Sequence, residues 1–160
     1  MGISTFYRLL AEHGTARNAL EHLPDIAQSR GLAGYRACSK KDAMRELSQG
    51  IKYGARLVFR GQPDYPKQLG QISDAPPLIW ARGDLGLAKR PVTALMGVRN
   101  ASALGCQIAR RLAHDLGQAG DCIVSGLARG IDAAAHQAAL ETGTIAILAG
   151  GLKTIYPPRT

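Results

Sequence analysis

The sequence is poor in cysteine, in aromatic residues and in long apolar runs. Its three cysteines, Cys38, Cys106 and Cys122, are an odd and widely spaced set. This spacing argues against a disulfide framework and a paired-cysteine metal site, and favours a reducing compartment, so a cytoplasmic protein is expected. No run approaches the roughly 18 apolar residues of a membrane span, and no signal-peptide pattern opens the chain. With aromatics at only 5%, core packing is a better explanation for them than stacking on bases.

Acidic residues are also few. The chain has 20 Lys and Arg against 12 Asp and Glu, a net charge of +8. Residues 1–90 hold 14 of the basic and 8 of the acidic residues, which gives +6, and residues 91–160 hold 6 and 4, which gives +2. A basic surface attracts polyanions such as nucleic acids. A charge of this size is equally compatible with a soluble surface that has no such partner. Charge alone therefore leaves the partner open.

Three segments with different patterns follow one another along the chain. Residues 1–52 have the pattern of a small helical module, with Thr15 as an N-cap and Pro24 in a first helical turn. Its helices are expected near residues 6–14, 16–20, 25–30 and 41–52. Such a module contacts either DNA backbones or other proteins, and the pattern does not distinguish the two. Residues 53–90 form a connector with strands near 56–60 and 77–82, separated by turn residues.

From residue 91 the pattern is strand, loop, helix, repeated. Continuous apolar runs predict buried strands at 92–96, 122–124 and 144–148. Helices are expected at 102–116, with apolar residues at four-residue steps, and at 131–141, which is rich in alanine. Strands that alternate with helices of this length predict a parallel sheet with right-handed crossovers. The fold class is therefore α/β, with a Rossmann-like sheet preceded by the helical module.

Each of the three strands runs directly into a loop that contains glycine. In an open parallel sheet these loops share one edge, where ligands bind. Glycine lets a ligand approach the backbone and lets successive N–H groups face an anion, although such turns also use glycine for purely structural reasons. Arginine and serine in the same loops suit phosphate. The candidate binding residues are Gly97, Arg99, Ser102, Ser125, Gly126, Arg129, Gly130, Gly150, Gly151 and Lys153.

Motifs of nucleotide enzymes are absent from these loops. None has the GxGxxG pattern of dinucleotide-binding domains or the GxxxxGK[ST] pattern of phosphate-binding loops, so an NAD enzyme and a P-loop ATPase are disfavoured. Asp132 and His136 are four residues apart on the second helix. They form either an acid–base pair or a helix cap beside a packed histidine. No metal cluster and no cofactor are expected.

Several stretches of sequence carry longer motifs. They are GVRNAS at 97–102, IVSGLARGIDAAAH at 123–136, LAGGLKTIYP at 148–157, and the upstream DYPKQL at 64–69 and PLIWARG at 77–83. Together they resemble the DprA/Smf family of DNA-processing proteins. The helical start likewise resembles the N-terminal module of that family, of the SAM or helix-hairpin-helix type. The resemblance covers nearly the whole chain.

The resemblance implies a protein without enzymatic activity. Family members bind single-stranded DNA on the Rossmann-like domain, protect incoming DNA and load the RecA recombinase during natural transformation. It implies contacts to DNA phosphates by Arg99, Ser102, Ser125, Gly126, Gly150 and Gly151, and a homodimer in the full-length protein. Lys153 stands where the family commonly has an acidic residue. The chain stops soon after Tyr156 and Pro157, so we expect it to be the first part of a longer domain.

An enzyme is the main alternative. Nucleoside-monophosphate phosphoribohydrolases have a related glycine-rich fold and a PGGxGTxxE motif whose glutamate takes part in the chemistry. Residues 149–154 supply the glycines, but tyrosine and two prolines follow where that motif has its glutamate. This difference favours the DNA-binding hypothesis. A scaffold with vestigial loops is a third possibility.

Overall fold

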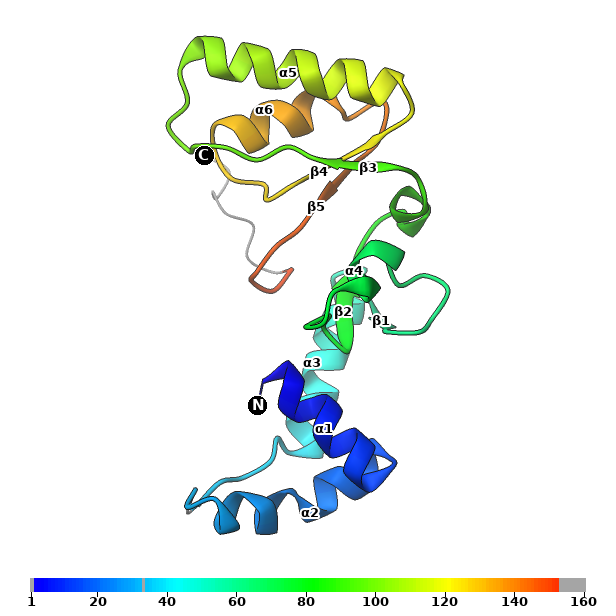
Figure 1. Cartoon of the computed structure of the whole chain (residues 1–160), viewed down its shortest axis with the longest axis vertical. Helices are drawn as coiled ribbons and strands as arrows, with labels where there is room; N and C mark the ends of the chain where they lie inside the picture. The colour runs from blue at the N-terminus through cyan, green and yellow to red at the C-terminus, as the bar shows by residue number, and fades with distance from the viewer. Residues whose placement is uncertain (1, 33, 153–160) are drawn as a thin grey trace.

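A computed structural model describes residues 2–32 and 34–152. Figure 1 shows three parts along the long axis: helices α1 to α3, the strand pair β1–β2 with its short helices, and a sheet with α5 and α6. The expected helical module followed by an α/β region is confirmed. Within the described residues, no helix is both long and apolar enough to span a membrane.

The first two helices form a hairpin. Helix α1 spans Ile3–His13 and ends at Gly14, whose φ of 73° favours glycine. Helix α2 spans Ala16–Ser29, and the Thr15 hydroxyl accepts a hydrogen bond from the Asn18 amide at 3.1 Å, which confirms the predicted N-cap. Leu9, Ala19 and Leu23 form the buried core of the hairpin.

Helix α2 is continuous through Pro24, so the prediction of two helices at 16–20 and 25–30 is wrong. Proline removes one helical N–H and tends to kink a helix, but it does not always end one. Leu23 and Ala27 are both buried, one on each side of the proline and on the same face. Leu23 belongs to the hairpin core and Ala27 is buried as well, so burial on both sides of the proline favours a continuous helix.

Helix α3 spans Lys40–Lys52 and begins one residue earlier than expected, after the N-cap Ser39. None of its residues is buried. It attaches to the strand pair through Trp80. A Cβ atom on Gly50 would overlap the Trp80 ring, and the Trp80 Nε1 donates to Glu46 Oε1 at 3.3 Å. Trp80 is therefore a packing residue between α3 and β2.

The connector contains strands β1, Arg56–Phe59, and β2, Leu78–Ala81, which pair antiparallel. Helix α4, Lys67–Gln71, and the 3₁₀ helix η1, Leu85–Lys89, flank the pair. Its core consists of Val58, Tyr65 and Ala81. The Tyr65 hydroxyl donates to the Pro76 carbonyl at 2.7 Å, which fixes the turn before β2. The predicted connector strands are thus present as one small hydrogen-bonded unit.

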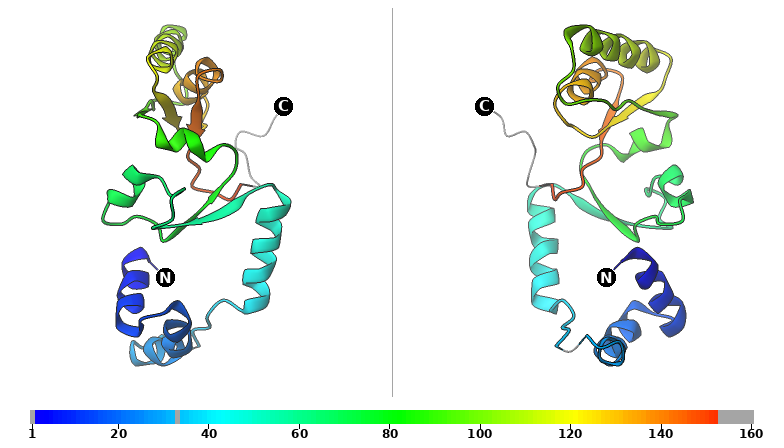
Figure 2. Two further views of the ribbon diagram at one scale, coloured as in Figure 1. Left: turned by 90° about the vertical axis from the view of Figure 1, so that its right-hand side faces the viewer. Right: turned by 60° about the vertical axis from the view of Figure 1, so that its left-hand side comes forward.

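The sheet confirms the predicted parallel topology. Strands β3, Val92–Ala94, β4, Cys122–Ser125, and β5, Thr144–Ala146, are parallel and lie in the order β3-β4-β5. Helices α5, Ala103–Gln118, and α6, Ile131–Ala138, connect them. Both helices pack on the same core, which includes Ala113 of α5, Ile123 of β4 and Ala135 of α6. Figures 1 and 2 show the two helices together on one side of the sheet.

Helix α5 packs through small residues. Its buried positions are Ala109, Ala113 and Gly117. A Cβ on Gly117 would overlap the Thr142 side chain, so the helix approaches its neighbours too closely for a larger residue. Of the apolar line at four-residue steps, only Leu116 packs on the core. Leu104, Ile108 and Leu112 are 64%, 52% and 47% exposed. Small residues, not the leucines, set the packed face.

Arg90 joins the two turns at the edge opposite the glycine loops. Its guanidinium donates to the Gly120 carbonyl at 2.8 Å, to the Asp121 carbonyl at 3.4 Å and to the Thr142 carbonyl. These turns precede β4 and β5. One side chain therefore fixes the starting points of two strands.

We expect Arg90→Lys to lower the free energy of unfolding by about 1–3 kcal/mol, since lysine cannot reproduce the forked geometry and leaves carbonyls without donors. Urea unfolding of the whole chain measures the change. The matched control is Arg111→Lys, because Arg111 is exposed and forms only a weak surface ion pair with Asp115. Equal stability of the two variants would contradict the role given to Arg90.

Candidate nucleic-acid interface

The parallel register brings the loops after β3, β4 and β5 to one edge of the sheet. We call residues 97–102 the first loop, residues 125–130 the second loop and residues 149–152 the described part of the third loop. The first two loops are in direct contact, because the Val98 and Arg99 carbonyls lie where a Cβ on Gly130 would stand. The Ile131 amide, directly after the second loop, donates to the Val98 carbonyl at 3.4 Å. The third loop begins soon after β5. Between the two, the Ile147 amide donates to the Ser125 carbonyl at 2.9 Å, so the chain still lies beside the end of β4. The predicted placement of the loops at one edge is confirmed.

A buried carboxylate ties the first two loops together. Asp132, in the first turn of α6, is 6% exposed. Its Oδ1 accepts from the Gly97 amide at 3.3 Å, and its Oδ2 accepts from the amides of Gly126 at 3.1 Å and Ala128 at 3.4 Å. The side chain thus connects the end of β3, the end of β4 and the start of α6. All three of these amides lie before α6, so Asp132 ties loops together and is not the N-cap of its own helix.

This arrangement changes the expected role of the glycine amides. The amides of Gly97 and Gly126 donate to a carboxylate inside the protein, so they do not line an open anion cavity. Gly130 also has a structural role, with a φ of 83°, and a Cβ there would overlap the Val98 carbonyl oxygen. These glycines allow the two loops to pack against each other. Whether they contact DNA stays a prediction.

Backbone strain occurs in the same place. Leu127, in the second loop, has a φ of 58° and is the only non-glycine residue in the left-handed region among residues 2–32 and 34–152. Such a conformation persists only where the surroundings impose it, and it is common at functional sites. Here the amides on either side of Leu127, those of Gly126 and Ala128, both bond to Asp132. The carboxylate therefore holds the strained turn in place.

The two candidate serines have different surroundings. Ser125 is 2% exposed, and its hydroxyl donates to the Leu95 carbonyl at 2.6 Å, so it joins β4 to the end of β3. Ser102 is exposed and caps α5, where its oxygen accepts from the Gly105 amide at 3.1 Å. The hydroxyl hydrogen of Ser102 stays available to a ligand. Ser125 instead belongs to the layer that supports the loops.

The remaining candidates are exposed. Arg99 in the first loop and Arg129 in the second are both exposed, and neither forms an ion pair within the described part of the chain. Gly150 and Gly151 are exposed, with no atom within 4 Å of where a Cβ would stand. Lys153 lies outside the described residues. The edge thus presents two unpaired cations and an open stretch of backbone.

His136 lies in the buried layer below the loops. It is 7% exposed, and its Nδ1 is 2.7 Å from Thr144 Oγ1. Because the Thr144 hydroxyl already donates to the Ile123 carbonyl, its oxygen accepts from Nδ1. Burial lowers the pKa of His136, and the negative charge of Asp132 opposes this shift. The packed histidine of the second interpretation is confirmed, but the helix cap is not, because the amides that Asp132 accepts from all lie before α6.

Comparison with known proteins places the chain among DNA-processing proteins. The family model for DNA recombination-mediator protein A matches residues 56–160, and the model for the DprA-like N-terminal HHH domain matches residues 1–48. The DNA processing protein DprA of Streptococcus pneumoniae is 44% identical over 95 residues, which cover 58% of this chain and 33% of that protein. DNA processing protein DprA of Bacillus subtilis is 40% identical over 116 residues, which cover 71% of this chain and 39% of that protein. The chain spans between a third and two fifths of these relatives.

Solved structures agree with the sequence matches. The X-ray structure of DprA from Streptococcus pneumoniae superposes with a TM-score of 0.70 and 31% identity, over 94% of this chain and 54% of that one. A second structure, of DNA processing protein A from Helicobacter pylori, describes the single-stranded DNA binding mode of that protein. It superposes with a TM-score of 0.58 and 31% identity, over 64% of this chain and 46% of that one.

Replacing Asp132 with asparagine tests the support of the loops. The amide group of asparagine cannot accept at both positions, so backbone N–H groups lose a charged acceptor. We expect a loss of about 3 kcal/mol of unfolding free energy. Chemical unfolding measures it. The control, Asp115→Asn, breaks only the exposed pair with Arg111 and should cost less than about 1 kcal/mol. A cost for Asp132→Asn as small as that of the control would contradict the assignment.

The lowered pKa of His136 predicts a pH-dependent stability. Between the native pKa and the ordinary value of 6.5, the unfolded chain binds a proton that the native chain does not. The unfolding free energy should therefore fall as pH drops through this window, and His136→Asn should flatten the slope. Urea unfolding at several pH values measures it. His114→Asn, which changes an exposed histidine on α5, should leave the slope unchanged. An unchanged slope in His136→Asn would refute this explanation.

Proposed function

The chain belongs to the DprA/Smf family of DNA-processing proteins, and on this premise we propose that it binds single-stranded DNA through the sugar-phosphate backbone. The observation that carries the proposal is the exposure of Arg99 and Arg129, without ion-pair partners in the described residues, on two loops at one sheet edge. The Helicobacter relative, whose structure describes a single-stranded DNA binding mode, supports the choice of ligand.

The site divides into residues that touch DNA and residues that support them. Arg99 and Arg129 supply positive charge, Ser102 a hydroxyl donor, and Gly150, Gly151 and Lys153 the third loop. Below them, Asp132 fixes the loop backbones, with the supporting candidates Gly97, Ser125, Gly126 and Gly130. Cations on a fixed backbone bind phosphates whatever the base sequence. Binding by this edge is therefore sequence-independent and weakened by salt.

The wider role follows the family. We propose that the intact protein protects incoming DNA, mediates recombination by loading RecA during natural transformation, and acts as a homodimer. The name of the matching family model, DNA recombination-mediator protein A, supports the mediator role. Residues 1–52, 53–90 and 91–160 are proposed as separate units. Separate buried clusters around Leu9, Val58 and Ala113 support this division.

We propose no enzymatic activity. In the alternative, a phosphoribohydrolase, a carboxylate must reach the substrate. Asp132, the acidic side chain in the first turn of α6, is buried and holds three backbone amides. His136 is buried beside Thr144. Neither is placed to act on a ligand above the loops.

Substitution of Arg99 tests the proposed binding. Arg99→Ala should weaken binding of oligo-dT and of mixed-sequence oligonucleotides alike, and reduce the slope of log K against log salt by about 0.7. Fluorescence anisotropy across salt concentrations measures both. Arg110→Ala, which removes an exposed cation from the middle of α5, is the control and should change neither. Binding that is absent, or independent of salt, would overturn the function, as would turnover of nucleoside monophosphates that needs Asp132.

A further inference from the structure

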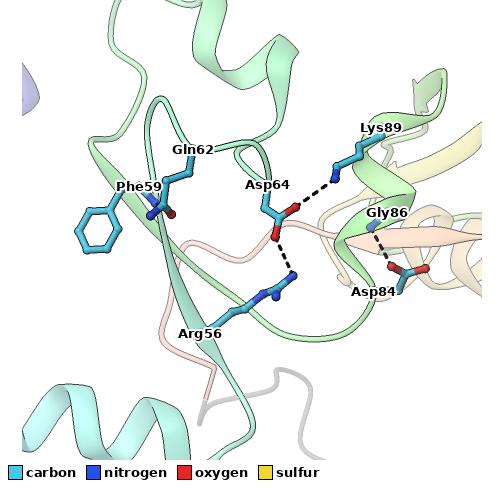
Figure 3. A network of polar contacts seen from close by, with 7 residues as sticks. All are labelled: Arg56, Phe59, Gln62, Asp64, Asp84, Gly86 and Lys89. Atoms are coloured by element: carbon cyan, nitrogen blue, oxygen red, sulfur yellow. Dashed lines mark hydrogen bonds and ion pairs between the residues drawn. The ribbon is translucent and has the colours of Figure 1, made fainter.

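A polar cavity lies away from the loop edge, in the connector. It has a volume of about 520 Å³ and is bounded by the turn before β1, the end of β2 and the helix η1. This volume is within the range of sites that hold small molecules or parts of larger ligands. Figure 3 shows side chains of its wall, where Asp64 lies between Arg56 and Lys89. We call it the connector pocket.

The wall of the connector pocket has one more cation than it has carboxylates. Its cations are Arg56, Arg82 and Lys89, and its carboxylates are Asp64 and Asp84. Asp64 holds two of the cations, with Oδ2 at 3.2 Å from Arg56 Nη2 and Oδ1 at 3.1 Å from Lys89 Nζ. The hydrogen bond and charge of Lys89 lower the pKa of Asp64, with a smaller contribution from Arg56, so this carboxyl stays ionised.

The Asp84 carboxylate also has a partner within the wall. Its Oδ1 accepts from the Gly86 amide at 2.7 Å and caps η1, as Figure 3 shows. Arg82, by contrast, forms no ion pair or side-chain hydrogen bond within residues 2–32 and 34–152. Asp64 and Asp84 thus already have partners within the pocket wall, whereas the Arg82 guanidinium has none in the described residues. An anion would complete the set of charges.

Two glycines leave the floor of the pocket open. Gly54 and Gly83 have φ values of 70° and 99°, which other residues rarely adopt. The only atom within 4 Å of a Cβ at Gly54 is the Arg82 Nε, at 4.0 Å, and a Cβ at Gly83 would meet nothing. A ligand can therefore approach the backbone beside Arg82. A phosphodiester group, whose two non-bridging oxygens share one negative charge, matches both the charge and the forked donors of arginine.

The third loop links this pocket to the loop edge. In both views of Figure 2 the end of the described chain, in red, comes down beside the end of α3, where Gly54 begins the pocket wall. Single-stranded DNA that runs from the loop edge along the third loop therefore reaches the connector. We propose that the connector pocket binds a backbone phosphate of the same single-stranded DNA that the loop edge binds. This inference rests on the proposed function.

The test uses the whole chain and two lengths of oligo-dT. A length of about 5 nucleotides fills the loop edge alone, and one of about 20 extends beyond it. Arg82→Ala should weaken binding of the longer DNA about fivefold, as expected for one exposed ion pair, and leave the shorter unchanged. Arg110→Ala is the charge-matched control and should affect neither length. Thermal melting checks that both variants keep the stability of the parent chain.

The outcomes separate the inference from the proposed function. A parent chain that binds neither length in a salt-dependent way overturns the proposed function. A parent chain that binds both, while Arg82→Ala binds both as the parent does, overturns the connector pocket alone. Equal weakening at both lengths also overturns it, because the effect would then be a general loss of charge. Loss of thymidine monophosphate binding in Arg82→Ala, without a length effect, would assign the pocket to free nucleotides instead.

Discussion

The arrangement of the loop edge depends on one buried carboxylate. An ionised side chain with 6% exposure is very unfavourable unless hydrogen bonds replace its water. Asp132 obtains them from backbone amides at the ends of two neighbouring strands. Those bonds flank the left-handed turn at Leu127. Glycine at position 130 is required separately, because the Val98 and Arg99 carbonyls lie where its side chain would stand. The exposed arginines are therefore carried on backbone that a single charge holds in place.

Local features were predictable from the sequence, and distant contacts were not. The N-cap role of Thr15 could be predicted because it depends only on Thr15 and the residues up to three positions after it. The loops at the strand ends could be predicted from the alternation of apolar runs with helices. The bond between Asp132 and Gly97 spans 35 positions, and nothing in either stretch indicates it. The continuity of α2 through Pro24 likewise depends on packing by Leu23 and Ala27. Residue type located the candidate site, but tertiary contacts decide which candidates face the solvent.

The helical module is joined to the rest of the chain through aromatic residues. The Tyr7 hydroxyl donates to the Ala75 carbonyl at 3.1 Å, and the Arg60 guanidinium lies 5.2 Å from the centre of the Tyr7 ring. Trp80 makes the second attachment, to α3. Both attachments are to the strand pair and its turns. The connector is therefore the support to which the helical module is attached.

The contact at Gly130 limits where this protein can accept inserted residues. The Val98 and Arg99 carbonyls lie where a side chain on Gly130 would stand, so the first and second loops fit only at their present sizes. We expect an insertion in either loop to displace its neighbour and to disturb the amides that Asp132 holds. Engineered peptide tags or longer recognition segments therefore belong outside the three loops of this edge.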